Sequence, residues 1–174
     1  MAIFTKQYIE LLSKETNFLK DNLEKVLRLA NILQYINSDC FFKNRLILKG
    51  GSAINLTILN LPRLSVDIDF DFGENICKDA IKDARIQIRQ RLIAYMQNEG
   101  YFLKTTIREH YILDSIQFHY FNNTGNPDTI KIEINYLDRV HIFNPEYKVV
   151  CNRILKSEFS ILTLNITELY ASKV

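Results

Sequence analysis

The sequence has few cysteines and no long apolar run. Its three cysteines, Cys40, Cys77 and Cys151, lie far apart, and no C-x-x-C pair occurs. A disulfide framework and a zinc knuckle are therefore not indicated, and a reducing, cytoplasmic location is expected. The opening stretch MAIFTKQYIELLSKE carries charges throughout. We therefore expect neither a signal peptide nor a membrane span.

The sequence also lacks a strong charge of one sign and the common hydrolase motifs. With a net charge of +2, nucleic acid is permitted as a partner but is not indicated by composition. The three histidines, His110, His119 and His141, do not show H-x-x-x-H spacing, which argues against a zinc hydrolase. Neither a G-x-S-x-G motif nor a Cys/His catalytic pattern stands out.

What is present is the composition of a globular domain. The 174 residues are 47% apolar and 24% charged, which is enough for one domain with a real core. Apolar periodicity and turn residues predict helices and strands. The expected helices span about 5–17, 20–37, 53–59 and 78–98. The expected strands span about 45–49, 64–72, 101–108, 111–121, 129–137 and 139–143.

A final helix is expected near residue 166. Asn165 is a good N-cap, Glu168 stands at the capping-box position, and Leu164 and Leu169 fit a hydrophobic staple. The chain stops at Val174, which would leave this helix shorter than average. We therefore expect that a C-terminal region is missing.

The stretch LSVDIDFDF, residues 64–72, is an alternating strand with an unusual polar face. Its apolar residues would face a core, while Asp67, Asp69 and Asp71 share the opposite side. Aspartates this close repel one another, and a divalent cation would remove that repulsion. A solvated strand face remains the alternative interpretation. We interpret Asp71, at the end of the strand, as a surface residue.

The stretch LILKGGSAINL, residues 46–56, predicts a strand, a glycine turn and a helix. Gly50 and Gly51 would let the backbone approach a phosphate, with help from the helix N-terminus and the Ser52 hydroxyl. An ordinary tight turn is the alternative, since the stretch is neither a Walker loop nor a G-x-G-x-x-G motif.

Together the two stretches are more specific than either one alone. A later alternating strand, TIKIEINYL, places Glu133 and Lys131 on its polar face. Two carboxylates on one strand and a third on a neighbour can hold two metal ions about 4 Å apart. Such ions clamp a triphosphate and assist phosphoryl-type transfer.

The residues LKGGSAINL followed by RLSVDIDFDF resemble the nucleotidyltransferase superfamily with a DNA polymerase β-type palm. More narrowly, they resemble the AbiEii/AbiGii toxin family, because Arg63 and Ser65 also precede the D-x-D pair. The stretch IKIEINY is similar to the strand that carries the family's third carboxylate. The resemblance covers about residues 45–174, with Ser52 in place of the usual threonine. A later R-x-x-x-R-D-type motif of the family does not occur within these 174 residues.

This resemblance implies an α/β (α+β) fold, a nucleotidyltransferase palm with a mixed, mostly antiparallel sheet and flanking helices. Residues 1–40 would form N-terminal helices, and 41–174 the catalytic domain with its C-terminal helical region truncated. The expected catalytic and metal-binding residues, for Mg²⁺ or Mn²⁺, are Asp67, Asp69 and Glu133. The expected nucleotide-binding residues are Gly50, Gly51, Ser52, Arg63, Ser65, Lys131 and Lys173. Lys49 is a further candidate phosphate contact.

In family terms, the implied reaction transfers a nucleotide from an NTP to an RNA, such as tRNA, or to a protein. The protein would act as the toxin of a toxin–antitoxin or phage-defence system with a cognate antitoxin. Three alternatives remain open. They are a catalytically silent nucleotide- or RNA-binding module, a short antitoxin-like nucleotidyltransferase, and a structural domain with an acidic strand. The roughly 45 residues before the glycine turn argue against the second.

Overall fold

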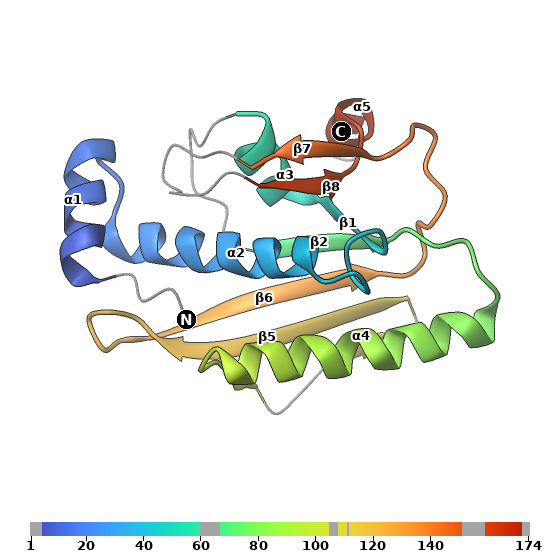
Figure 1. Cartoon of the computed structure of the whole chain (residues 1–174), viewed down its shortest axis with the longest axis horizontal. Coiled ribbons are helices and arrows are strands. Elements are labelled where there is room, and N and C mark those ends of the chain that lie inside the picture. Colours follow the sequence, from blue (N-terminus) through green and yellow to red (C-terminus); the bar gives the residue numbers. More distant parts are fainter. Residues whose placement is uncertain (1–4, 60–66, 105–107, 111, 151–158, 172–174) are drawn as a thin grey trace.

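The structure is a computed structural model that describes residues 5–59, 67–104, 108–110, 112–150 and 159–171 (Figure 1). The described helices are α1 (Lys6–Thr16), α2 (Lys20–Ser38), α3 (Gly50–Thr57), α4 (Lys78–Asn98) and α5 (Ile166–Ala171). The first four strands are β1 (Leu46–Lys49), β2 (Asp67–Phe72), β3 (Phe102–Leu103) and β4 (Arg108–His110). The others are β5 (Leu113–Phe121), β6 (Pro127–Asn135), β7 (Glu146–Val149) and β8 (Ser160–Thr163).

The strands form one mixed sheet in the order β3-β5-β6-β2-β1-β8-β7, with β4 paired to β5 outside this path. The pairs β2–β6 and β1–β8 are parallel, and the other described pairs are antiparallel. The predicted mixed, mostly antiparallel sheet is therefore confirmed. Because β2 lies between β1 and β6, the two motif-bearing stretches and the later acidic strand are direct neighbours.

One face of this sheet forms the core with the long helices. Figure 1 shows α2 and α4 covering the same face of the sheet. The predicted alternation holds, since the apolar side chains of β2 and β6 are fully buried. Helix α2 supplies Leu23, Leu27 and Leu33 to the same core. The site face of β2 and β6 is therefore the opposite one, which α2 and α4 leave uncovered.

Most of the expected elements match the structure closely. The helices predicted at 5–17, 20–37 and 78–98 begin and end within a residue of α1, α2 and α4. Helix α3 begins at Gly50 itself, earlier than expected after the glycine turn. Within the predicted strand 101–108, the described residues form the short strands β3 and β4 instead. None of the described helices combines the length and the apolar character needed to cross a bilayer.

The strand predicted at 139–143 is wrong. In the structure this segment is irregular, and two of its apolar side chains, Val140 and Ile142, lie open to solvent. The Ile142 N–H donates to the Glu168 carboxylate at 2.6 Å, which replaces a strand partner. Strands β7 and β8, further along the chain, were not anticipated because β7 lies at the sheet edge without a buried face.

The predicted cap of the final helix is confirmed in part. The Asn165 side chain accepts a hydrogen bond from the Thr167 N–H at 2.9 Å, as an N-cap should. Leu164 and Leu169 are both buried, as a hydrophobic staple requires. However, Glu168 turns to the backbone of residue 142 instead of completing a capping box. Helix α5 therefore holds the segment between β6 and β7 in place.

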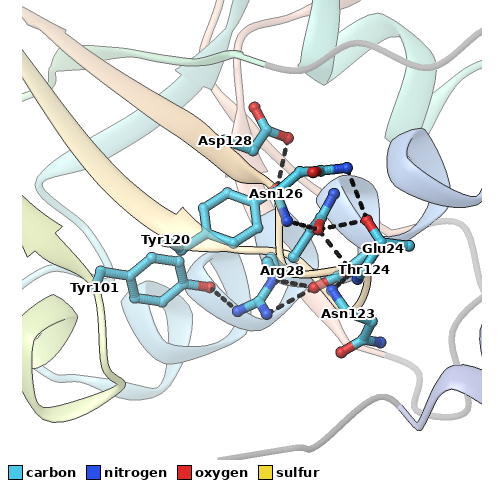
Figure 2. A network of polar contacts seen from close by, with 9 residues as sticks. Glu24, Arg28, Tyr101, Tyr120, Asn123, Thr124, Asn126 and Asp128 are labelled. Atoms are coloured by element: carbon cyan, nitrogen blue, oxygen red, sulfur yellow. Dashed lines mark hydrogen bonds and ion pairs between the residues drawn. The ribbon is translucent and has the colours of Figure 1, made fainter.

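A partly buried polar cluster fastens α2 to the β5–β6 hairpin (Figure 2). Glu24 accepts hydrogen bonds from Arg28 at 2.7 Å and from the Asn123 N–H at 2.8 Å. The Arg28 guanidinium also stacks over the Tyr120 ring, 4.3 Å from its centroid. Asp128 accepts a hydrogen bond from the Tyr120 hydroxyl at 2.8 Å. We call these five residues the hairpin cluster.

Candidate active site

The glycine turn brings the backbone against a carboxylate of the site. Gly50 follows β1 directly and has a φ of +71°, which L side chains rarely adopt. A Cβ added at Gly50 would lie 2.3 Å from Oδ2 of Asp69. A glycine is therefore required here for two reasons, its backbone conformation and the close approach of Asp69. The proposed contact of Gly50 and Gly51 with phosphate stays a prediction.

Strands β2 and β6 place the remaining candidates in register. Asp67 lies opposite Lys131 and Asp69 opposite Glu133 in this parallel pair. All four side chains leave the face opposite to the core because they alternate with buried isoleucines and Phe70. The structure thus brings together the three carboxylates and one lysine that the sequence had placed on two separate strands.

The Ser52 hydroxyl is engaged with protein backbone. Ser52 is buried, and its Oγ donates a hydrogen bond to the carbonyl oxygen of Asp67. This contact fastens α3 to the first residue of β2, so it positions the aspartate strand beside the glycine turn. A direct contact of Ser52 with phosphate remains a prediction. Arg63, Ser65 and Lys173 lie outside the described residues.

The carboxylates are in electrostatically unfavourable surroundings. Burial raises the pKa of Asp69 above its ordinary value, and the charges of Glu133 and Asp67 raise it further. Glu133 instead has a cationic partner, because Lys131 Nζ lies 2.9 Å from its Oε1. The hydrogen bond to Glu133 in turn raises the pKa of Lys131. Asp69 is therefore the carboxylate that would gain most from a cation.

Asp71 corrects an expectation from the sequence. It is only 2% exposed, not a surface residue at a strand end. Lys49 Nζ lies 2.5 Å from its Oδ1, and the Asn135 amide donates to the same oxygen at 2.9 Å. Burial raises the pKa of Asp71, while Lys49 and Asn135 act in the opposite direction. The signal was in the alternation, which puts Asp71 on the face of Asp67 and Asp69.

A cleft of about 460 Å³ opens over these side chains. Its lining combines Lys49, Gly50, Asp69, Glu133 and Asn135 with apolar residues. This volume lies in the range of small-molecule sites. One ligand in this cleft could therefore contact the backbone at Gly50, the carboxylates of Asp69 and Glu133, and the Lys49 ammonium.

The carboxylates of Asp67, Asp69 and Glu133 are candidate ligands for a divalent cation. Carboxylate oxygens are the ligands that Mg²⁺ and Mn²⁺ prefer, and Asp67 and Asp69 are adjacent on one strand face. A cation would also relieve the repulsion that raises the Asp69 pKa. Within the described ranges, however, no three His, Cys, Asp or Glu side chains lie close enough to hold a metal. The chemistry of Asp67 and Asp69 is thus suited to a cation, while Glu133 pairs with Lys131.

The fold is shared with two solved structures from Helicobacter pylori. JHP933 from Helicobacter pylori superposes with a TM-score of 0.61 at 17% identity, over 90% of this chain and 57% of that one. A second H. pylori structure, provisionally described as a nucleotidyltransferase, gives 0.59 at 17% identity, over 90% and 59%. The chain thus spans less than three-fifths of the length of these two structures.

Sequence comparison places the chain within one family. The family model for the nucleotidyl transferase AbiEii toxin of type IV toxin–antitoxin systems matches residues 31–174. The chain therefore belongs to the AbiEii nucleotidyl transferase toxin family, as the glycine turn and aspartate strand predicted. None of the curated proteins is significantly similar to it in sequence. The match begins inside α2, so the predicted domain boundary at residue 40 stays a prediction.

Proposed function

We propose that this protein transfers a nucleotide from an NTP to an acceptor hydroxyl and releases pyrophosphate. The observation that carries the proposal is the register of β2 and β6, which puts Asp69 beside Glu133 and against Gly50. The acceptor oxygen would bond to the α-phosphorus while the bond to the bridging oxygen of pyrophosphate breaks. The proton of the hydroxyl would pass to a carboxylate, for which Glu133 is the candidate.

Asp67 and Asp69 would hold Mg²⁺ or Mn²⁺ in this reaction. A bound ion of this kind neutralises triphosphate charge and polarises the attacked phosphoryl group. The residues of the chain would supply the remaining contacts. Gly50 and Gly51 offer backbone to the phosphates, and Lys49 lies at the edge of the same cleft. Lys131 would contact the phosphates after it leaves Glu133.

Family membership supports a proposal for the acceptor and the partner. We propose an RNA, such as tRNA, or a protein as the acceptor, and a cognate antitoxin as the partner that controls the toxin in the cytoplasm. A toxin that modifies such an acceptor would arrest growth. The support for this proposal is the family membership over residues 31–174 together with the fold.

The test is transfer of label from α-³²P-NTPs. Each NTP is incubated with Mg²⁺, cellular RNA and the protein, and the products are separated into RNA and protein fractions. We expect label on one fraction with the native protein and none with Asp67→Ala/Asp69→Ala. The matched control is Asp21→Ala/Asp83→Ala, which removes two exposed aspartates from helices and should keep full transfer. Equal labelling by both double variants would contradict the proposal.

One observation favours a second function, a catalytically silent nucleotide-binding module. Glu133, the third candidate metal ligand, forms an ion pair with Lys131. Within the described residues, no three His, Cys, Asp or Glu side chains lie close enough together to hold a metal ion. Such a module would bind Mg²⁺ and NTP without transfer. Thermal stabilisation by Mg²⁺–NTP, at about 2.7 kcal/mol for ligand at a hundred times its Kd, combined with absence of label would support this alternative.

A further inference from the structure

A second cleft, of about 400 Å³, lies at the start of α4. We call it the basic cleft. Its cationic lining consists of Lys78, Lys82, Arg85 and Arg139, and no acid is among its described lining residues. The rest of the lining is apolar and includes Ile112 and Leu137. Such a surface suits a ligand with both negative charge and a flat apolar part.

The charges around the basic cleft do not cancel. Arg85 and Arg89 both approach Asp114, at 2.7 and 3.3 Å, so one buried carboxylate faces two guanidinium groups. Lys82 pairs with Asp79 at 3.0 Å, but both side chains are largely exposed and the pair is weak. The four cationic side chains that line the cleft thus outnumber Asp79 and Asp114, the two carboxylates described beside them.

Arg139 adds an unsatisfied donor to this charge. Its Nη1 donates to the Ile76 carbonyl at 3.1 Å. Its Nε is buried and has no hydrogen-bond partner among the described residues. An unpaired buried donor is costly, and a ligand oxygen would satisfy it. Helix α4 also begins here without a side-chain cap at Cys77, which leaves its first N–H groups without a capping side chain.

The basic cleft adjoins the candidate active site. Ile112 lines both clefts. At the end of β6 two consecutive residues divide between them, since Asn135 lines the active-site cleft and Tyr136 the basic cleft. A strand of nucleic acid leaving the active site over the end of β6 would enter the basic cleft directly.

We infer that the basic cleft binds the nucleotides next to the reacting end of a single-stranded RNA acceptor. Phosphates would face the lysines and Arg139, and a base would pack on Ile112 and Leu137. This inference rests on the proposed function and names its acceptor class. A protein acceptor lacks the phosphates that these four cationic side chains would contact.

The test measures RNA binding separately from catalysis. A fluorescent single-stranded RNA oligonucleotide is titrated, and its anisotropy is followed at several salt concentrations. The variant Lys78→Glu/Lys82→Glu changes two exposed residues of α4. We expect it to weaken binding by about tenfold or more and to reduce the salt slope by about 1.4 for two lost contacts. Lys6→Glu/Lys14→Glu makes the same charge change at two exposed positions of α1, outside the cleft, and should bind nearly as the native protein does.

Two results would overturn the inference. The first is equal loss of affinity in the two charge-reversed variants, which would show only general attraction to RNA. The second is absence of RNA binding by the native protein, with label found on protein instead. The variant Asp67→Ala/Asp69→Ala separates the two proposals, since it should lose transfer and still bind the RNA. If the basic cleft binds RNA but the native protein transfers no label, the proposed function fails and the RNA-binding site stands.

Discussion

Two regions of this molecule bury acidic side chains, and they do so in opposite ways. In the hairpin cluster, Glu24 is 2% exposed and meets a guanidinium and a backbone N–H. In the active site, Asp69 is half-buried, and this burial raises its pKa; the neighbouring carboxylates of Glu133 and Asp67 raise it further. The hairpin cluster compensates its buried charge from within the protein. The active site pairs Asp71 and Glu133 with lysines but leaves Asp69 among like charges, which a bound cation would compensate.

This difference separates a structural cluster from a functional one. A paired buried charge fastens elements together, and α2 is fastened to the β5–β6 hairpin in this way (Figure 2). A group of like charges destabilises the fold and is retained where a ligand needs it. Changes at the hairpin cluster should therefore affect stability first, and changes at the active site should affect activity first.

The largest effect is expected at the paired aspartates. Asp67→Ala/Asp69→Ala should lower nucleotide transfer by about 10²–10³-fold or more, because it removes the charges that organise the reacting phosphates. Its melting temperature should stay equal or rise, since Asp69 loses its repulsion from Glu133. The measurements are label transfer and thermal unfolding without divalent cations. A clear loss of stability would place these aspartates with the structural cluster.

The converse change is Glu24→Ala in the hairpin cluster. It leaves Arg28 partly buried without its carboxylate partner and should cost about 3 kcal/mol of unfolding free energy. Transfer per folded molecule should not change. Urea unfolding measures the loss. Glu10→Ala is the matched control, because it breaks the exposed pair with Lys20 and should leave stability unaltered. Similar unfolding midpoints for the two variants would refute this assignment.

Gly50→Ala tests the close approach of the turn and the site. The added methyl would strain the backbone and meet Asp69 Oδ2, so both stability and transfer should fall. Gly125→Ala is the control, since Gly125 has φ +83° but no atom within 4 Å of an added Cβ. It should lose only the conformational cost of about 1–2 kcal/mol. The additional loss of stability in Gly50→Ala, relative to Gly125→Ala, then measures the clash with Asp69. Equal losses in the two variants would contradict this close approach.

Asp71→Asn tests whether the third aspartate positions Lys49. The substitution removes the charge that holds the Lys49 ammonium at the cleft, so we expect KM for the NTP to rise about tenfold. The same change at Asp128, which pairs with Lys25 in the hairpin region, should leave KM unaltered. Steady-state kinetics of both variants provide the comparison. An unchanged KM in Asp71→Asn would leave this aspartate a purely structural role.

The smallest effect concerns pH. A carboxyl whose folded pKa is raised binds its proton more tightly in the folded state, so stability falls as pH rises from the ordinary 3.8 through the raised value. The stability of Asp69→Asn should therefore fall less over this pH range. Part of the fall should remain, because the pKa of Asp71 is raised as well. Melting temperatures across acidic pH without divalent cations give the comparison. Identical pH profiles would contradict the raised pKa of Asp69.

Much of the active site was predictable because alternation is a local property. The period of two in LSVDIDFDF and TIKIEINYL assigns each side chain to a face, and both assignments hold along β2 and β6. The glycine turn likewise marks a strand–helix junction from residue types alone. These patterns need no knowledge of which strands are neighbours.

Other features depended on partners that are distant in the sequence. Asp71 was misplaced because its burial comes from Lys49 and Asn135 on the two flanking strands. The segment 139–143 alternates like a strand, yet Glu168 takes its backbone donor. The basic cleft joins α4 to the segment after β6, and a linear pattern does not show that junction.

The sequence by itself therefore determined most of the helices, the strands that carry the site, the polar face of each site strand and the family, since these depend on residue type and local spacing. Only the tertiary structure decided that Asp69 lies beside Glu133 and against Gly50. It also decided that Asp71 is buried with a lysine. The physical reason is that a carboxylate's charge state and partners depend on whatever side chains the sheet pairing brings within a few ångströms.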